Sequence, residues 1–111
     1  DFFKFKSNGD KFYEFNNMLI ALEALPGIKK KIPSVVHVDN TVRPQVVTKG
    51  SNFLFYKLIT AFYKISQIPL LLNTSFNVKG EPIVNSPEDA IRCFFGTGLD
   101  YLIIGNFIIE K

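Results

Sequence analysis

The sequence is poor in the residues that build metal and disulfide sites. Its 111 residues include one cysteine, one histidine, one methionine and no tryptophan. A lone cysteine cannot form an internal disulfide, so a reducing, cytoplasmic location is expected, with Cys93 buried as a small apolar side chain on a helix. One histidine and one cysteine disfavour a zinc site, so no metal site is predicted. No apolar run reaches 18 residues, so no membrane span is expected.

The sequence also lacks a strong net charge, an initiating methionine and a signal peptide. The net charge is +3 and the pI about 9.0, and the densest basic cluster, residues 29–31, is expected to be a solvated surface turn. Nucleic acid is therefore not an expected partner, whereas a small anionic ligand is compatible. The chain begins without methionine or a signal-peptide pattern, so we expect it to have been cut from a longer protein.

The apolar content of 47% is enough for one folded domain, which would bury roughly 65% of its unfolded surface. Residues 34–39 and 41–48 are rich in valine and predict strands, and 68–72 predicts a central strand buried on both faces. Residues 51–67 have helical apolar spacing, with Ser51 as N-cap. Residues 1–31 are irregular and are interpreted as a peripheral segment.

Local signals near the C-terminus are clearer. Ser86, followed by proline and two acids, predicts the start of a helix that ends at Gly96 or Gly98, with Ala90, Ile91, Phe94 and Phe95 facing inward. Residues 101–104 and 107–109 predict strands joined by a Gly-Asn turn. The element order predicts an α/β fold with a mixed, twisted open sheet and flanking helices.

The loop after residues 68–72 is the first candidate site. It carries small polar side chains, a cation and a glycine that permits close backbone approach or a positive φ. Hydroxyl, amide and ammonium groups suit an anion. A turn whose side chains bond only their own backbone is an equally open interpretation. The candidate residues are Asn73, Thr74, Ser75, Asn77 and Lys79.

The second candidate is the segment of residues 37–43. Alternation along a strand would place His37, Asp39, Thr41 and Arg43 on one face, and the planar Arg43 guanidinium suits a phosphate. Asp39 could bind a metal ion, orient His37 or fix the turn. An ordinary exposed strand face remains open. A serine hydrolase and a P-loop nucleoside triphosphatase are both disfavoured, because the spaced glycines of their motifs are missing.

Five ordered motifs resemble the C-terminal domain of the O-carbamoyltransferases, the family of nodulation-factor and antibiotic carbamoyltransferases. The resemblance covers residues 32–111, which we take as the domain portion, and it also extends to the YrdC family through a Ser-x-Asn nucleotide-binding motif. The motifs are His-Val-Asp-Asn-Thr-Val-Arg-Pro-Gln (37–45), Leu-Asn-Thr-Ser-Phe-Asn-Val-Lys-Gly-Glu-Pro-Ile (72–83), Ser-Pro-Glu-Asp-Ala (86–90), Gly-Leu-Asp (98–100) and Gly-Asn-Phe (105–107).

The resemblance implies a YrdC-like fold in which ATP, with Mg²⁺, and carbamoyl phosphate form carbamoyl adenylate. An N-terminal, metal-containing domain of actin-like fold would then transfer the carbamoyl group to a hydroxyl acceptor. Arg43 and Lys79 would hold the reacting anion and are the catalytic candidates. Ser75 and Asn77 would contact ATP phosphates or their magnesium, with Asn73 and Thr74 beside them, and His37 and Asp39 would orient the ligand.

The sequence departs from the family pattern in three places. Lys79 stands where arginine is usual, and Asn40 stands where glycine is common. The Lys-x-Arg motif that holds the triphosphate has no counterpart and would lie before Asp1, so the domain is expected to be truncated on its N-terminal side and inactive alone. A non-catalytic nucleotide-binding or structural module is the alternative, and a threonylcarbamoyl-adenylate synthase relative fits the signatures less well.

Overall fold

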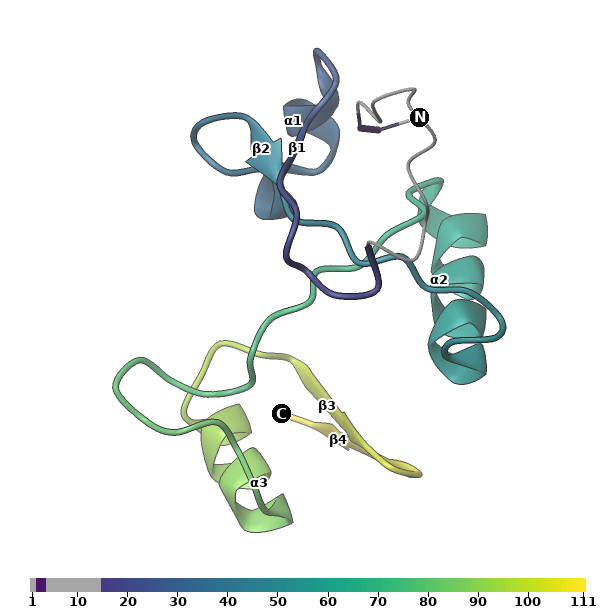
Figure 1. Cartoon of the computed structure of the whole chain (residues 1–111). Coiled ribbons are helices and arrows are strands. Elements are labelled where there is room, and N and C mark those ends of the chain that lie inside the picture. Colours follow the sequence, from purple (N-terminus) through teal and green to yellow (C-terminus); the bar gives the residue numbers. More distant parts are fainter. Residues whose placement is uncertain (1, 4–14) are drawn as a thin grey trace. The chain divides into compact units, whose positions relative to one another are not determined.

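The computed structural model describes residues 2–3 and 15–111 (Figure 1). The chain divides into two compact units, Asp1–Leu72 and Asn73–Lys111. The candidate segment of residues 37–43 belongs to the first unit, and the candidate loop of residues 73–82 belongs to the second.

The first unit begins with an antiparallel pair of two-residue strands. Strand β1 (Leu22–Glu23) pairs with β2 (Thr41–Val42), so that Leu22 lies opposite Val42. Between them lie the short helix α1 (Ile28–Lys31) and the 3₁₀ turn η2 (Pro33–Val35). A small apolar cluster holds these elements together, and its buried members are Ala24, Ile32, Val36 and Val42.

Two expectations for this region are wrong. The predicted strand 34–39 is a 3₁₀ turn followed by a tight turn, because Pro33 starts the former and Asn40 takes a positive φ of 66° in the latter. The predicted strand 41–48 ends after Val42.

Residues 29–31, expected on a loop, form the exposed end of α1. Part of the segment interpreted as peripheral, β1, pairs with β2; the division after residue 31 itself stays a prediction.

Helix α2 (Phe53–Ser66) confirms the predicted helix but not its cap or its burial. Asn52 is the N-cap, and its side chain accepts a hydrogen bond from the Phe55 backbone N–H, whereas Ser51 bonds to Thr48. None of the helix residues is buried. Its expected inner face is open, since Leu58 is 53% and Ile65 86% exposed. An amphipathic stripe is thus present without a covering partner among the described residues.

Residues 68–72 do not form the predicted central strand. The segment has no strand conformation and pairs with no described strand. Pro69 lacks a backbone N–H, which weakens any ladder through this segment. Ile68 and Leu70 instead pack against the apolar cluster of the first unit.

The second unit consists of one helix and one hairpin. Helix α3 (Pro87–Phe95) starts at Ser86, whose hydroxyl accepts from the Asp89 backbone N–H, and ends at Gly96, as predicted. Strands β3 (Tyr101–Ile104) and β4 (Phe107–Glu110) pair through a turn in which Gly105 has a φ of 55°. Helix α3 packs on β3 (Figure 1).

The core of this unit lies between α3 and the hairpin. Ala90, Phe94 and Leu102 are buried in one cluster, and Cys93 is also buried with a free thiol, as predicted. Ile91 and Phe95 were expected to face inward, but they are 41% and 58% exposed. The nine-residue helix therefore buries a narrower stripe than its sequence predicts.

The α/β class is confirmed by these elements. In place of one mixed sheet, the strands of the described residues form two separate antiparallel pairs, β1–β2 and β3–β4. Within that part of the chain, no helix is both long and apolar enough to cross a bilayer.

Candidate functional site

Residues 37–41 form a closed turn that leads into β2. The His37 N–H donates to the Thr41 carbonyl at 2.8 Å, and the Asn40 N–H donates to the His37 carbonyl at 3.1 Å. Asn40 takes the left-handed conformation, and its side-chain amide donates to the Ala24 carbonyl at 3.2 Å. The turn is thereby fastened to the segment that follows β1.

Three side chains of this turn are hydrogen-bonded in a row. Asp39 Oδ1 accepts from the Thr41 backbone N–H at 3.0 Å and from the Thr41 hydroxyl at 2.7 Å. Thr41 Oγ1 also lies 3.1 Å from His37 Nδ1. The hydrogen bonds from the Thr41 hydroxyl and the Thr41 backbone N–H lower the pKa of Asp39. Asp39 is therefore ionised at neutral pH.

The predicted common polar face is wrong in its geometry. Alternation along a strand cannot align His37, Asp39 and Thr41, because the chain turns at Asn40; it is the turn that brings these three together. Arg43 comes directly after β2, is exposed, and makes no hydrogen bond or ion pair with any described residue. Its guanidinium is free to meet a ligand.

The loop of residues 73–82 is braced by Asn77. The side-chain amide of Asn77 donates to the Val78 carbonyl at 3.2 Å and to the Glu81 carbonyl at 3.0 Å. The Glu81 N–H donates to the Val78 carbonyl, and Gly80 has a φ of 89°, which fits the predicted use of glycine here. The Asn77 amide hydrogens thus shape the loop.

The other candidate residues of this loop lie at the surface. Asn73, Thr74, Ser75 and Lys79 are all exposed. Within the described part of the chain, the side chains of Thr74, Ser75 and Lys79 have no hydrogen-bond or ion-pair partner. A hydroxyl and an ammonium without internal partners, on a loop held by Asn77, can bind an anion. The structure does not test these roles, which stay predictions.

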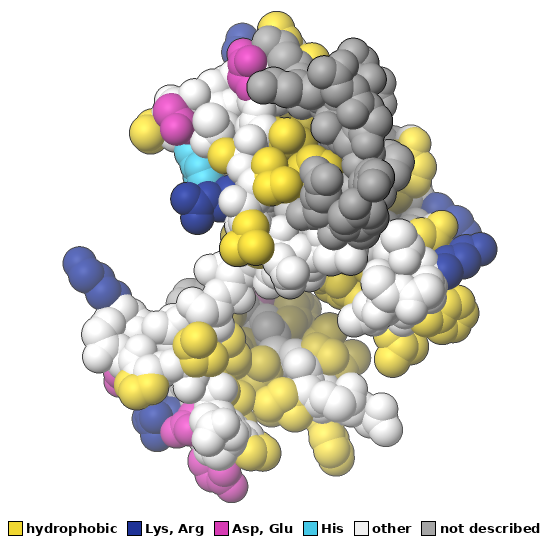
Figure 2. All heavy atoms as spheres, viewed as in Figure 1, with side chains coloured by type: hydrophobic (Ala, Val, Ile, Leu, Met, Phe, Trp, Pro, Cys, Tyr) yellow, Lys and Arg dark blue, Asp and Glu magenta, His cyan; other side chains and the backbone are white. Residues whose placement is uncertain are grey.

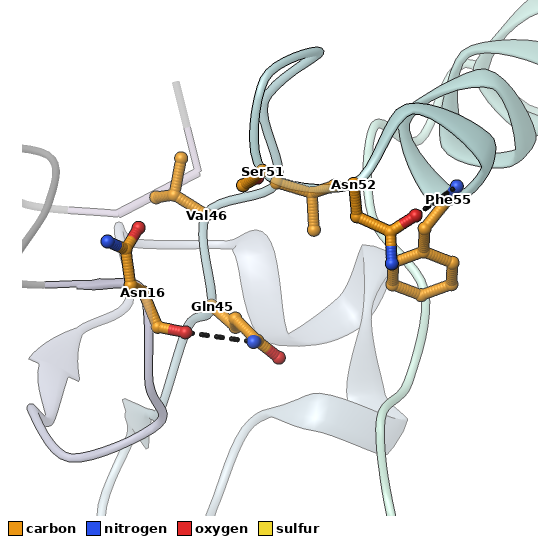
Figure 3. A pocket seen from close by; sticks show the side chains of 7 residues that line it. Asn16, Gln45, Val46, Ser51, Asn52 and Phe55 are labelled. Atoms are coloured by element: carbon orange, nitrogen blue, oxygen red, sulfur yellow. Dashed lines mark hydrogen bonds between the residues drawn. The ribbon is translucent and has the colours of Figure 1, made fainter.

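A pocket of ≈ 400 Å³ lies elsewhere in the first unit, beside the start of α2 (Figure 3). The Gln45 side chain donates across it to the Asn16 carbonyl at 2.9 Å. None of the eight predicted site residues lines this pocket, whose walls are Asn16, Gln45, Val46, Val47, Ser51, Asn52 and Phe55. The described residues also contain no group of three His, Cys, Asp or Glu side chains able to hold a metal ion.

The sequence interpretation placed Thr41 on the candidate polar face without giving it a role of its own, and it gave Lys29 no place in the site. Thr41 joins Asp39 to His37, and the Lys29 ammonium donates to the His37 carbonyl at 3.4 Å. The Asp-x-Thr spacing was the available signal for the first contact, since an aspartate often bonds the backbone two residues on. The contact of Lys29 is between residues eight apart and has no local signature.

Comparisons with known proteins agree on one family. A sequence model described as the carbamoyltransferase C-terminus matches residues 3–111. Nodulation protein NolO of Bradyrhizobium diazoefficiens is 38% identical over 104 residues, which are 94% of this chain and 19% of that protein. Nodulation protein NolNO of Sinorhizobium fredii is 39% identical over 102 residues, 92% of this chain and 15% of that protein. An uncharacterized protein of Synechocystis is 44% identical over 93 residues, which are 84% of this chain and 15% of that protein.

The chain thus spans less than a fifth of the length of these relatives. The family match includes both polar segments, and it starts at residue 3, within the segment interpreted as peripheral. The resemblance carried by the five motifs is confirmed by a match over almost the whole sequence. On this coverage, the chain belongs to the carbamoyltransferase C-terminal family.

Proposed function

We propose that this chain is the C-terminal part of a cytoplasmic, ATP-dependent O-carbamoyltransferase, where it binds ATP and carbamoyl phosphate for the formation of carbamoyl adenylate. The family match supports the class of enzyme. The observation that carries the anion chemistry is the exposed loop of residues 73–82, which presents Ser75 and Lys79 without internal partners while Asn77 fixes its shape.

In this proposal, positively charged side chains bind the anionic ligands and neutralise their charge. Arg43 binds ligand oxygens through its planar fork, and Lys79 neutralises a phosphate as a point charge. Adenylyl and phosphoryl transfer depend chiefly on such positioning and neutralisation, so no protein nucleophile is required. Ser75 Oγ and Asn77 Oδ1 are suitable oxygen ligands for the Mg²⁺ that accompanies ATP, where the ion would neutralise phosphate charge.

The proposal includes a further part of the protein, the metal-containing domain of actin-like fold that would pass the carbamoyl group to its hydroxyl acceptor. The relatives are more than five times longer than the aligned part. The chain also exposes large apolar side chains on α2 and on the β3–β4 hairpin, where Ile103 is 70% and Phe107 72% exposed. Yellow side chains lie open over much of the surface in Figure 2. Such surface suits burial against a neighbouring domain.

Calorimetry on this chain with Mg²⁺-ATP and with carbamoyl phosphate tests the proposal. Arg43→Ala and Lys79→Ala are each expected to weaken binding by about tenfold or more, because a hydrogen bond to a charged group is worth about 1.5 to 3 kcal/mol. Lys30→Ala, which removes an equal charge from α1, serves as the control.

Two results would decide against the proposal. Binding of the anions that is unchanged in both variants would remove the assigned roles of Arg43 and Lys79. Binding of neither anion, even at millimolar concentration, would favour the alternative of a non-catalytic structural module. The longer enzyme, assayed for ATP-dependent carbamoyl transfer with the same two variants, extends the test to turnover.

A further inference from the structure

The row of hydrogen bonds in residues 37–41 fixes the position of one proton. A threonine hydroxyl has a single hydrogen and two lone pairs. The Asp39 carboxylate is ionised and can only accept, so the 2.7 Å bond between the two oxygens uses the Thr41 hydrogen. Thr41 Oγ1 therefore has only lone pairs left for its other neighbour.

That other neighbour is His37 Nδ1, 3.1 Å from Thr41 Oγ1. Because Oγ1 must accept there, the hydrogen of this bond belongs to Nδ1. In the neutral ring the second nitrogen, Nε2, then has no hydrogen and presents a lone pair. His37 is exposed, and Figure 2 shows the single histidine (cyan) at the surface beside a basic side chain. The donor and acceptor roles in these two hydrogen bonds thus assign the Nδ1–H tautomer to the neutral His37 ring.

We propose that Thr41 is a positioning residue that holds His37 with Nε2 toward an anionic, phosphate-bearing ligand, and that Nε2 takes up a proton from solvent as the ligand binds. The imidazolium then donates the new Nε2–H to a ligand oxygen, and the ring gains one positive charge for the one proton taken up. This inference rests on the proposed function, since it concerns the same anionic ligands.

The Asp39 carboxylate favours this uptake, whereas the basic side chain beside the ring in Figure 2 opposes it. The Asp39 carboxylate is linked to the ring through Thr41 and stabilises the imidazolium, in the manner of an aspartate behind a catalytic histidine. On the other element in contact, α1, Lys29 reaches the His37 carbonyl and not the ring. The new Nε2–H would meet a ligand dianion, and an opposite charge at hydrogen-bond distance stabilises the protonated ring.

The first test needs no ligand. His37 is the only histidine in the chain, so ¹⁵N-detected NMR of the imidazole reports its tautomer without ambiguity. We expect the Nδ1–H form in the wild-type chain and in Thr41→Ser, which keeps the hydroxyl, and loss of that preference in Thr41→Val, which has the same shape without it. The Nε2–H form in the wild-type chain would overturn the assignment.

The second test measures the proton. Calorimetric titration with inorganic sulfate, a tetrahedral dianion that does not titrate near neutral pH, is run in buffers of different ionisation enthalpy. We expect uptake of up to one proton per anion in the wild-type chain and in Thr41→Ser. Thr41→Val is expected to lose this uptake and to bind about tenfold more weakly, as a hydrogen bond to a charged group predicts.

The two tests separate this inference from the proposed function. Sulfate binding without proton uptake, or uptake that survives in Thr41→Val, would overturn the role of His37 and Thr41 while leaving anion binding in place. If neither sulfate nor Mg²⁺-ATP binds, both the role of His37 and the proposed function fail for this chain. The tautomer of His37 is tested by NMR without a ligand, so that result does not depend on the titrations.

Discussion

The side-chain amide of Asn77 donates to the main-chain oxygen of Glu81, 3.0 Å away across the polar loop. A second bond from the same nitrogen reaches the Val78 carbonyl. One side chain therefore closes the turn of residues 77–81 within the loop. The loop keeps its shape through Asn77, and this shape leaves Ser75 and Lys79 available.

Asn77→Ala is expected to destabilise the second unit by about 0.5 to 1.5 kcal/mol, because it removes these side-chain hydrogen bonds. Asn77→Asp is expected to be worse for anion binding, since a carboxylate would face two carbonyl oxygens and repel an anion. Denaturant unfolding and titration with carbamoyl phosphate in the absence of Mg²⁺ measure the two effects in the two variants, since a carboxylate would otherwise also bind the metal ion. Equal anion affinity in Asn77→Asp and Asn77→Ala would contradict the electrostatic part.

Exchanging the two types of cation distinguishes Arg43 from Lys79. Arg43→Lys keeps the charge but loses the planar fork, so anion binding is expected to weaken by several-fold to about tenfold. Lys79→Arg is expected to be neutral or favourable, because arginine keeps the charge and presents a planar pair of donors that matches two phosphate oxygens. Affinities for carbamoyl phosphate, measured side by side, test this; an unaltered affinity in Arg43→Lys would argue against bidentate binding.

Asn40 is a non-glycine residue with a left-handed backbone conformation. Its φ of 66° is one that glycine adopts freely and asparagine tolerates. Asn40→Ala is expected to cost about 1 to 2 kcal/mol, through left-handed strain and the lost bond to the Ala24 carbonyl. Asn40→Gly loses the bond without the strain and should cost less. Thermal unfolding ranks the two; a larger loss in Asn40→Gly would refute the reasoning.

The cap of α3 gives a stability prediction in the second unit. The Ser86 hydroxyl satisfies the Asp89 backbone N–H at 3.1 Å. Ser86→Ala is expected to lower the free energy of unfolding by about 1 kcal/mol, whereas Ser86→Thr retains most of it. Urea denaturation followed by helical circular dichroism provides the measurement, and similar losses in both variants would indicate packing instead of capping.

The carboxyl group of Asp89 is expected to make the free energy of unfolding depend on pH. The hydrogen bond with Ser86, followed by the contacts with Arg92, lowers the pKa of Asp89 below its ordinary value of 3.8. Because the folded pKa is below the unfolded one, the stabilisation is fully present above the unfolded value and disappears as pH falls through the folded value. Asp89→Asn should thus be less stable than wild type at pH 7 and equal to it near pH 2. A difference in unfolding free energy between Asp89→Asn and wild type that stays constant from pH 7 to about pH 2 would contradict this dependence of stability on the pKa of Asp89.

Local signals in the sequence predicted local structure well. The Ser-Pro-Glu-Asp start of α3 and the Gly-Asn turn between β3 and β4 each depend on a few adjacent residues, and both are confirmed. Strands 34–39 and 68–72 failed because a strand needs a neighbour to bond with, and apolar content alone does not supply one. The polar cluster of His37 and Asp39 was placed correctly for the wrong reason, since a turn forms it.

The burial of α2 could not be predicted from its own spacing. Apolar residues three and four apart indicate a stripe, but the covering partner is a property of the rest of the protein. The anion-site residues were identified by family motifs, and the bracing role of Asn77 became visible only with its hydrogen bonds.

The uncovered stripe on α2 also bears on how this chain is handled in a cell. Leu54, Leu58 and Ile65 present to solvent the kind of surface that chaperones recognise on unfinished proteins. Expressed without its covering partner, the chain should be held by chaperones or degraded even though its helices are formed. Its steady-state abundance would then report on the supply of that partner, and not on the stability of the fold alone.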